Sequence, residues 1–255
     1  MQTNLEIRSS FKLLMLATAL TVALWFVPLA GFITYPFSIF GTFIHETGHA
    51  LAALFTLGGV HDIAINWNGS GLTRTTGGWG LLISSAGYLS TTIYGAGLLL
   101  LLRSARLARP AAIVTGVLLL LVTLFWGSNL GVWVAGLGFG LVCIALTLKA
   151  SIKFVHFFMS FLAIQSLLNA FYDLRTLMYL SSVDPAVPSD AQNMAMATGG
   201  LVPAMVWAVG WTFISLAMLA ATLFIYYRSL KRQSDTGSLS AVPLITEMPH
   251  STINR

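Results

Sequence analysis

The sequence predicts an all-α polytopic membrane protein with about seven (six to seven) transmembrane helices and a β-hairpin in the loop after the second. Charged residues make up only 8% of the 255 positions and hydrophobic residues 56%, whereas a soluble domain carries about 25% charged residues. Mean hydropathy is +0.83. No soluble fold of this size could bury so much apolar surface, so soluble enzymes, disordered chains and nucleic-acid-binding proteins are excluded.

Seven apolar runs are long enough to cross a bilayer, which takes about 17–25 helical residues. They cover residues 11–33, 36–58, 79–102, 110–126, 128–148, 154–180 and 200–227. We expect one membrane domain over residues 1–232 and a disordered, Ser/Thr-rich tail over residues 233–255. The expected setting is a bacterial-type cell membrane, with the lipid bilayer as the surrounding partner, and the sequence leaves the oligomeric state open.

The loop over residues 59–78 predicts a β-hairpin. Ile63, Ile65 and Trp67 alternate with smaller or polar residues and lead into Asn68-Gly69. This dipeptide is typical of a type I′ turn, which needs positive φ at both central positions. The three alternating residues are candidates for binding a substrate. The other long connection, residues 181–198, predicts a loop with a short helix.

The second apolar run contains His45, Glu46 and His49 in the pattern His-Glu-Thr-Gly-His. On a helix the two histidines share one face, so both imidazoles can bind one metal ion. Two histidines and one carboxylate suit a single Zn²⁺ with a position open for water. Glu46 lies to the side of the pair and is the candidate catalytic base that activates this water. A purely structural polar cluster is the weaker alternative.

A third metal ligand is expected from a distant helix. Asp173 is the remaining acid within a predicted span, and both it and His49 lie about 12–15 Å from the same membrane face at 1.5 Å per residue. The alternatives for Asp173 are an ion pair with Arg175 or a cap at a helix kink. Asp190 is the rival ligand if its loop folds inward. His156 fails the depth comparison and is expected to pack or to lie at the interface.

Two further features lie near this predicted site. Asn169, one turn before Asp173, could orient the metal site, bind substrate backbone or pack between helices. Small residues line one face of the third apolar run, at Ser84, Ser85, Gly87, Ser90 and Gly95. Close helix packing explains this face best, and it would also leave room for an extended peptide beside the metal.

These motifs resemble the site-2 protease family of intramembrane zinc metalloproteases. Residues 43–50, Phe-Ile-His-Glu-Thr-Gly-His-Ala, resemble that family's active-site helix, and the hairpin resembles its membrane-associated β element. Residues 169–174, Asn-Ala-Phe-Tyr-Asp-Leu, resemble its second motif, although Leu174 stands where the family has glycine and the usual proline is absent. The resemblance spans residues 37–200, is closest to a compact branch without a PDZ insertion, and implies that Asp173 is the third zinc ligand.

The resulting hypothesis is a zinc metalloendopeptidase acting on transmembrane protein substrates. A substrate helix would unwind and add as a strand to the hairpin, and Glu46 would activate water and then protonate the leaving amine. The alternatives are a divalent-metal transporter and a catalytically silent membrane scaffold on the same fold. A transporter would need further histidine or acid ligands in a facing span.

Orientation in the membrane stays open from the sequence. With seven spans, one face would carry Arg103, Arg106, Arg109, Lys149, Lys153, Arg228, Lys231 and Arg232, and the other Arg8, Lys12 and Arg74. Because eight lysines and arginines lie on the first face and three on the second, the first face is favoured as cytoplasmic. The family resemblance implies instead that the active-site end of the second span faces the cytosol, and seven spans cannot satisfy both. A miscounted span between residues 110 and 148 would ease the conflict.

Overall fold

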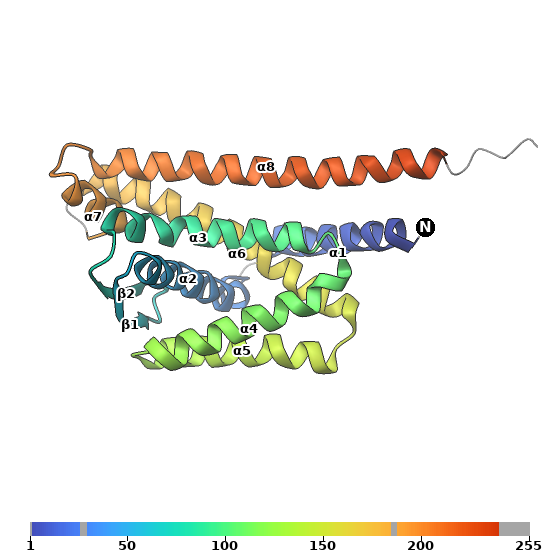
Figure 1. The fold of residues 1–255 in the computed structure, drawn as a ribbon, viewed down its shortest axis with the longest axis horizontal. Coiled ribbons are helices and arrows are strands. Elements are labelled where there is room, and N and C mark those ends of the chain that lie inside the picture. Colours follow the sequence, from blue (N-terminus) through green and yellow to red (C-terminus); the bar gives the residue numbers. More distant parts are fainter. Residues whose placement is uncertain (1, 26–29, 185–187, 240–255) are drawn as a thin grey trace, which may run out of the picture.

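The computed structural model describes residues 2–25, 30–184 and 188–239. These residues form a bundle of long helices with a small two-stranded sheet at one end (Figure 1). The elements, in chain order, are α1 (Gln2–Trp25), α2 (Ala30–Phe55), β1 (Gly59–Ile65), β2 (Gly71–Thr76), α3 (Gly80–Leu101), the 3₁₀ helix η1 (Ala105–Leu107), α4 (Ala108–Trp126), α5 (Leu130–Lys149), α6 (Ile152–Val183), α7 (Asp190–Ala197) and α8 (Ala204–Leu239).

Four helical segments of the described residues are long and apolar enough to cross a membrane. They are Ala105–Trp126, Leu130–Lys149, Ile152–Val183 and Ala204–Ser229. The seven predicted runs coincide with α1 to α6 and α8, but the count of seven spans is not confirmed. The His-Glu-Thr-Gly-His motif lowers the hydropathy of α2, and Gly, Ser and Thr do the same in α3.

The helices pack in three groups (Figure 1). α8 lies along one side, α3 and α6 occupy the middle with α2, and the antiparallel pair α4 and α5 forms the opposite side. Large apolar side chains on the outer surface remain exposed, among them Phe125, Phe213 and Phe224 at 67%, 69% and 59%. Such an apolar exterior is what a lipid-facing surface requires.

The sheet forms as predicted, with β1 and β2 antiparallel and Ile63 opposite Thr73. Its turn differs from the prediction. Gly69 has φ +88° but Asn68 does not have positive φ, so the two-residue type I′ turn is replaced by a longer one. The N–H of Gly69 donates to the carbonyl of Asn66, and the N–H of Asn66 donates to Ser70.

The outer edge of β1 is covered by the turn between α4 and α5. The backbone of Ile63 bridges to Gly127, and the N–H of Ser128 donates to the carbonyl of Ile63 at 2.9 Å. Asn129 accepts from the N–H of Ile65 and donates to its carbonyl. The other edge of the sheet, along β2, has no strand partner within the described residues. That open edge lies beside α2, which contacts β2.

The end of α6 is followed by α7, the short helix that the sequence predicted. Ser189 caps α7 by accepting from the N–H of Gln192, and Met194 of α7 packs in a cluster with Leu174 of α6 and Trp211 of α8. α8 continues through Leu239, so helix extends past residue 232, where the sequence predicted a tail to begin. Residues 240–255 lie outside the described part of the chain.

Candidate metal centre

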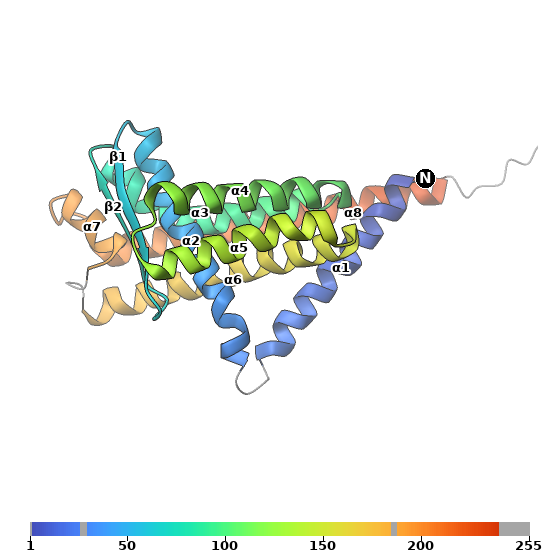
Figure 2. The same cartoon turned by 90° about the horizontal axis from the view of Figure 1, so that it is seen from below.

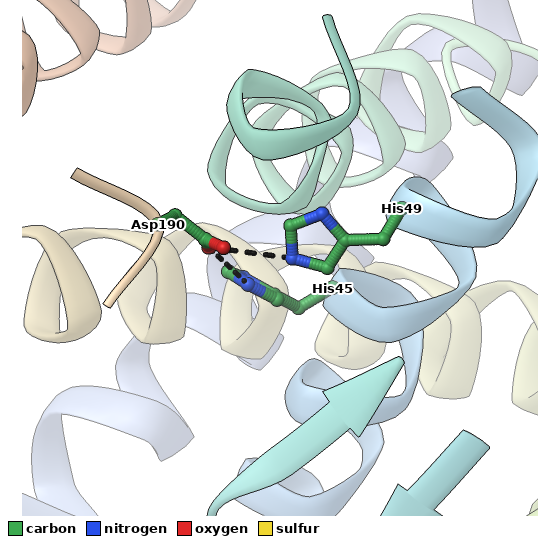
Figure 3. Close-up of side chains that lie close together, drawn as sticks. All are labelled: His45, His49 and Asp190. Atoms are coloured by element: carbon green, nitrogen blue, oxygen red, sulfur yellow. Dashed lines mark hydrogen bonds and ion pairs between the residues drawn. The ribbon is translucent and has the colours of Figure 1, made fainter. Parts of the chain in front are cut away.

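The two histidines of α2 converge on one carboxylate, that of Asp190 at the start of α7 (Figure 3). Nε2 of His45 lies 3.2 Å from Oδ2 of Asp190, and Nε2 of His49 lies 3.3 Å from the same oxygen. Both rings reach it because they are four residues apart and therefore one turn apart on the same helical face. The three ligand atoms lie within 4.8 Å of one another.

This arrangement needs a proton or a metal ion between its donor atoms. Nδ1 of His49 lies 2.7 Å from the carbonyl oxygen of Ile83, so this nitrogen carries the ring proton. In a neutral ring, Nε2 then presents a lone pair to the carboxylate oxygen of Asp190. Two lone pairs repel each other unless a proton or a metal ion lies between them. The donor set and the backbone contact that orients His49 both match a zinc site.

The electrostatics keep Asp190 ionised. Burial alone would raise the pKa of this carboxyl group. When a proton rather than a metal ion lies between the rings and the carboxylate, the charge of His49 and the hydrogen bonds from both imidazoles outweigh burial, and they hold the pKa of Asp190 well below its usual range. A carboxylate that is already deprotonated is the form that binds a metal ion.

Space for the two imidazoles comes from Gly87 of α3. A Cβ atom at this position would lie 2.3 Å from Nε2 of His45 and 2.5 Å from Nε2 of His49. Gly48 of α2 likewise lies against Ser90 of α3, so the two helices approach through small residues. The sequence placed Gly87 on a packing face but did not identify it as a site residue; its spacing within that small-residue face was the available signal.

The structure places Asp173 in the same cavity but not in the metal cluster. This cavity, of about 670 Å³, is lined by Asp173 together with His45, Glu46, His49 and Asp190. The comparison of depths along the helices therefore placed Asp173 at the correct end of the bundle. The carboxylate in contact with both imidazoles is nevertheless the rival, Asp190, because α7 folds back over the cavity.

Glu46 is held by the hairpin. Its side chain is buried at 4% exposure, and the hydroxyl of Thr73 in β2 donates to its Oε2 at 2.6 Å. The same hydroxyl lies 3.1 Å from the backbone carbonyl of Glu46. Gly71 of β2 leaves room for this carboxylate, since a Cβ there would lie 2.2 Å from its Oε1. Thr73 and Gly71 are site residues that the sequence analysis did not single out.

Tyr88 of α3 is another residue that the sequence did not identify. Its ring meets His45 edge-on at 4.7 Å between centroids and stacks on Trp211 at 5.3 Å. Tyr88 lines the cavity, and its hydroxyl has no hydrogen-bond partner among the described residues. The phenol is therefore a free donor beside the metal cluster.

The remaining predicted residues lie away from the cavity lining. Asn169 donates to the carbonyl of Ser38 at 3.2 Å, which joins α6 to α2. Ile63 and Ile65 are buried at 0% and 1% in the hydrophobic core, whereas Trp67 is exposed. His156 is buried and its Nε2 lies 2.7 Å from the carbonyl of Leu102, a packing contact far from the cluster.

Comparison with known proteins agrees with this geometry. The family model described as peptidase M50B-like matches residues 14–222, which is most of the chain. No curated protein and no solved structure gives a significant match. The match confirms the resemblance to the site-2 protease family, and together with the four apolar helices it identifies an integral membrane protein. The chain belongs to the peptidase M50B-like family.

Proposed function

We propose that this protein is a zinc-dependent endopeptidase that cleaves membrane-embedded or membrane-tethered polypeptides. The observation that carries the proposal is the convergence of His45, His49 and Asp190 in a cavity that also holds Glu46. Two imidazoles and a carboxylate leave a coordination position open, as in catalytic zinc sites. When bound, zinc would polarise the scissile carbonyl group and lower the pKa of a water molecule.

Glu46 serves as the general base. The hydrogen bond from Thr73 fixes its carboxylate, leaving its other oxygen to accept a proton from the attacking water. The hydroxyl oxygen bonds to the peptide carbon, the C–N bond breaks, and Glu46 returns the proton to the leaving nitrogen. Tyr88, which also lines the cavity, is the candidate donor to the oxygen that gains charge during the attack.

The substrate binds as an extended strand on the open edge of β2. Gly71, Leu72, Thr73 and Thr75 of this strand line the cavity. An unwound segment gains backbone hydrogen bonds by pairing with that edge. Since β1 is already paired on both sides, β2 is the edge that can receive the segment. This pairing would bring a peptide bond next to Glu46, which the same strand contacts.

Asp190 supplies the third zinc ligand in this proposal, with Asp173 across the same cavity as the competitor that the family motif implies. The purified protein should contain one zinc per chain by elemental analysis. Asp190→Asn should lower the zinc content strongly, and Asp173→Asn should lower it little. The opposite ranking would assign the ligand to Asp173, and unchanged zinc content in both variants would reject a three-ligand site.

Catalysis is tested with Glu46→Gln, which keeps the side-chain shape. Full-length protein in detergent is incubated with single-span model substrates, and the products are identified by mass spectrometry. Glu46→Gln should retain zinc and lose cleavage, and a zinc chelator should abolish cleavage by the native chain. Zinc binding without cleavage by the native chain would favour the scaffold alternative, and zinc uptake into proteoliposomes would favour the transporter.

A further inference from the structure

The basic residues gather at the end of the bundle opposite the metal centre. Three hydrogen bonds define this end: Arg103 donates to Ser229 at 2.7 Å, Arg109 donates to the carbonyl of Ala150 at 3.2 Å, and His156 contacts the carbonyl of Leu102. They join the end of α3, the starts of α4 and α6, the residue after α5 and the distal half of α8. The basic residues here are Arg103, Arg106, Arg109, Lys149, Lys153, Arg228, Lys231 and Arg232.

The start of α1 lies at this same basic end. The ring of Phe11 lies 6.3 Å from that of Tyr226, near the distal end of α8. Figure 2 shows the first turn of α1 next to the last turns of α8. Arg8 and Lys12 therefore join the eight basic residues above, so ten of the 13 lysines and arginines share one end.

The positions along α6 that contact α1 and α2 show how deep each of these two helices lies in the bundle. It runs from the basic end at Ile152 to the metal end at Val183. Gln165 of α6 lies 3.4 Å from Thr21 of α1, and Asn169 bonds to Ser38 of α2. At 1.5 Å per residue, these two contacts differ in depth by only about 6 Å.

α1 therefore reaches only the middle of the bundle, and α2 continues from there to the metal end (Figure 2). The two helices together cross once. We infer six crossings in all, one by α1 and α2 together and one each by α3, α4, α5, α6 and α8, of which the last four are long and apolar enough to span by themselves. Hydropathy alone counts α1 and α2 as two crossings, which would place Arg8 and Lys12 on the face opposite the other eight basic residues. α4 and α5 pack against each other as a helical hairpin, and each is long and apolar enough to cross.

We propose that the basic end faces the cytoplasm and that the metal centre opens on the opposite, non-cytoplasmic side of the membrane. Lysine and arginine near the ends of spans set orientation by remaining cytoplasmic. Among the described residues, the lysines and arginines of the metal end are Arg74 and Arg175, and Arg74 is paired with Asp62 at 2.7 Å. This orientation is opposite to the one that the site-2 protease resemblance implies.

The orientation restricts the substrate class, and this step rests on the proposed protease function. A polypeptide would reach β2 and Glu46 from the non-cytoplasmic side. The substrates would then be membrane-anchored proteins cut near their non-cytoplasmic membrane boundary.

Cysteine labelling tests the proposal without relying on catalysis. Cys143 is the only cysteine of the chain and is fully buried, so the native protein is the unlabelled control. Three single variants, His61→Cys at the metal end, Leu107→Cys at the basic end and Thr3→Cys at the start of α1, are treated with a membrane-impermeant maleimide in intact and in permeabilised cells. His61 and Leu107 are both exposed.

We expect position 61 to be labelled in intact cells, and positions 107 and 3 to be labelled only after permeabilisation. Labelling at 107 but not at 61 in intact cells would overturn the orientation, and labelling at both would overturn a single orientation. Labelling at 3 together with 61 would overturn the single crossing of α1 and α2. Because the readout is independent of cleavage, a protein of the expected topology that cleaves nothing would count against the protease function alone.

Discussion

Replacing Gly87 by alanine should destroy the metal centre while leaving the fold intact. The added Cβ would lie 2.3 Å from Nε2 of His45 and 2.5 Å from Nε2 of His49, whereas ordinary contact begins at 3.4 Å. Both ring nitrogens must therefore move by about 1 Å. Metal–ligand distances tolerate only about 0.2 Å. We expect zinc affinity to fall at least about 100-fold, which corresponds to about 2.8 kcal/mol.

Gly97→Ala in the same helix is the matched control. A Cβ at Gly97 would meet nothing within 4 Å, and both substitutions gain about 1 kcal/mol of helix propensity. Zinc affinity is measured by competition with a chromophoric chelator, and folding by thermal melting in detergent. Gly97→Ala should bind zinc as the native protein does. Native zinc affinity in Gly87→Ala, at an unchanged melting temperature, would refute the assignment of His45 and His49 as ligands.

Three further substitutions test the surroundings of the site. Thr73→Val removes the hydroxyl that holds Glu46. A bond to a charged group contributes about 1.5–3 kcal/mol, so kcat should fall roughly 10- to 100-fold with zinc retained. Thr76→Val, at the end of β2 and outside the cavity lining, should stay near the native rate. Tyr88→Phe keeps the ring contacts with His45 and Trp211 and should lower cleavage roughly 10-fold or more at unchanged zinc content; an unchanged rate would exclude a role for the hydroxyl. Asn129→Ala removes two hydrogen bonds to β1 and the N-cap of α5. The free energy of unfolding should therefore fall by about 1–3 kcal/mol, measured by thermal melting. A melting temperature equal to that of the native chain would contradict the anchoring of the sheet by this residue.

Local patterns predicted the parts of the structure that local chemistry determines. The spacing of His45 and His49 fixes their shared helical face, and the alternation around Ile63 and Ile65 predicts the strand. The alternation does not tell which face of the strand is buried. Both isoleucines pack in the core, and the strand that lines the cavity is β2.

The choice between two carboxylates depended on long-range folding. Asp173 and Asp190 are brought to the same cavity, and the sequence could estimate only the depth of each. Contact with both imidazoles is decided by how α7 folds back, which follows from the packing of Met194 against α6 and α8. Hydropathy cannot decide the number of crossings for a similar reason, since the length of an apolar run does not tell whether two consecutive helices cross the membrane separately or together.

The turn at Gly127, Ser128 and Asn129 has a consequence for how molecules of this protein meet one another. Exposed edge strands with unpaired backbone groups promote self-association and aggregation. Here the α4–α5 turn pairs with the edge of β1, and β2 lines the cavity inside the molecule. The sheet of a second molecule therefore has no outward-facing strand to pair with. The hairpin can accept an unwound substrate segment without making the protein prone to polymerise.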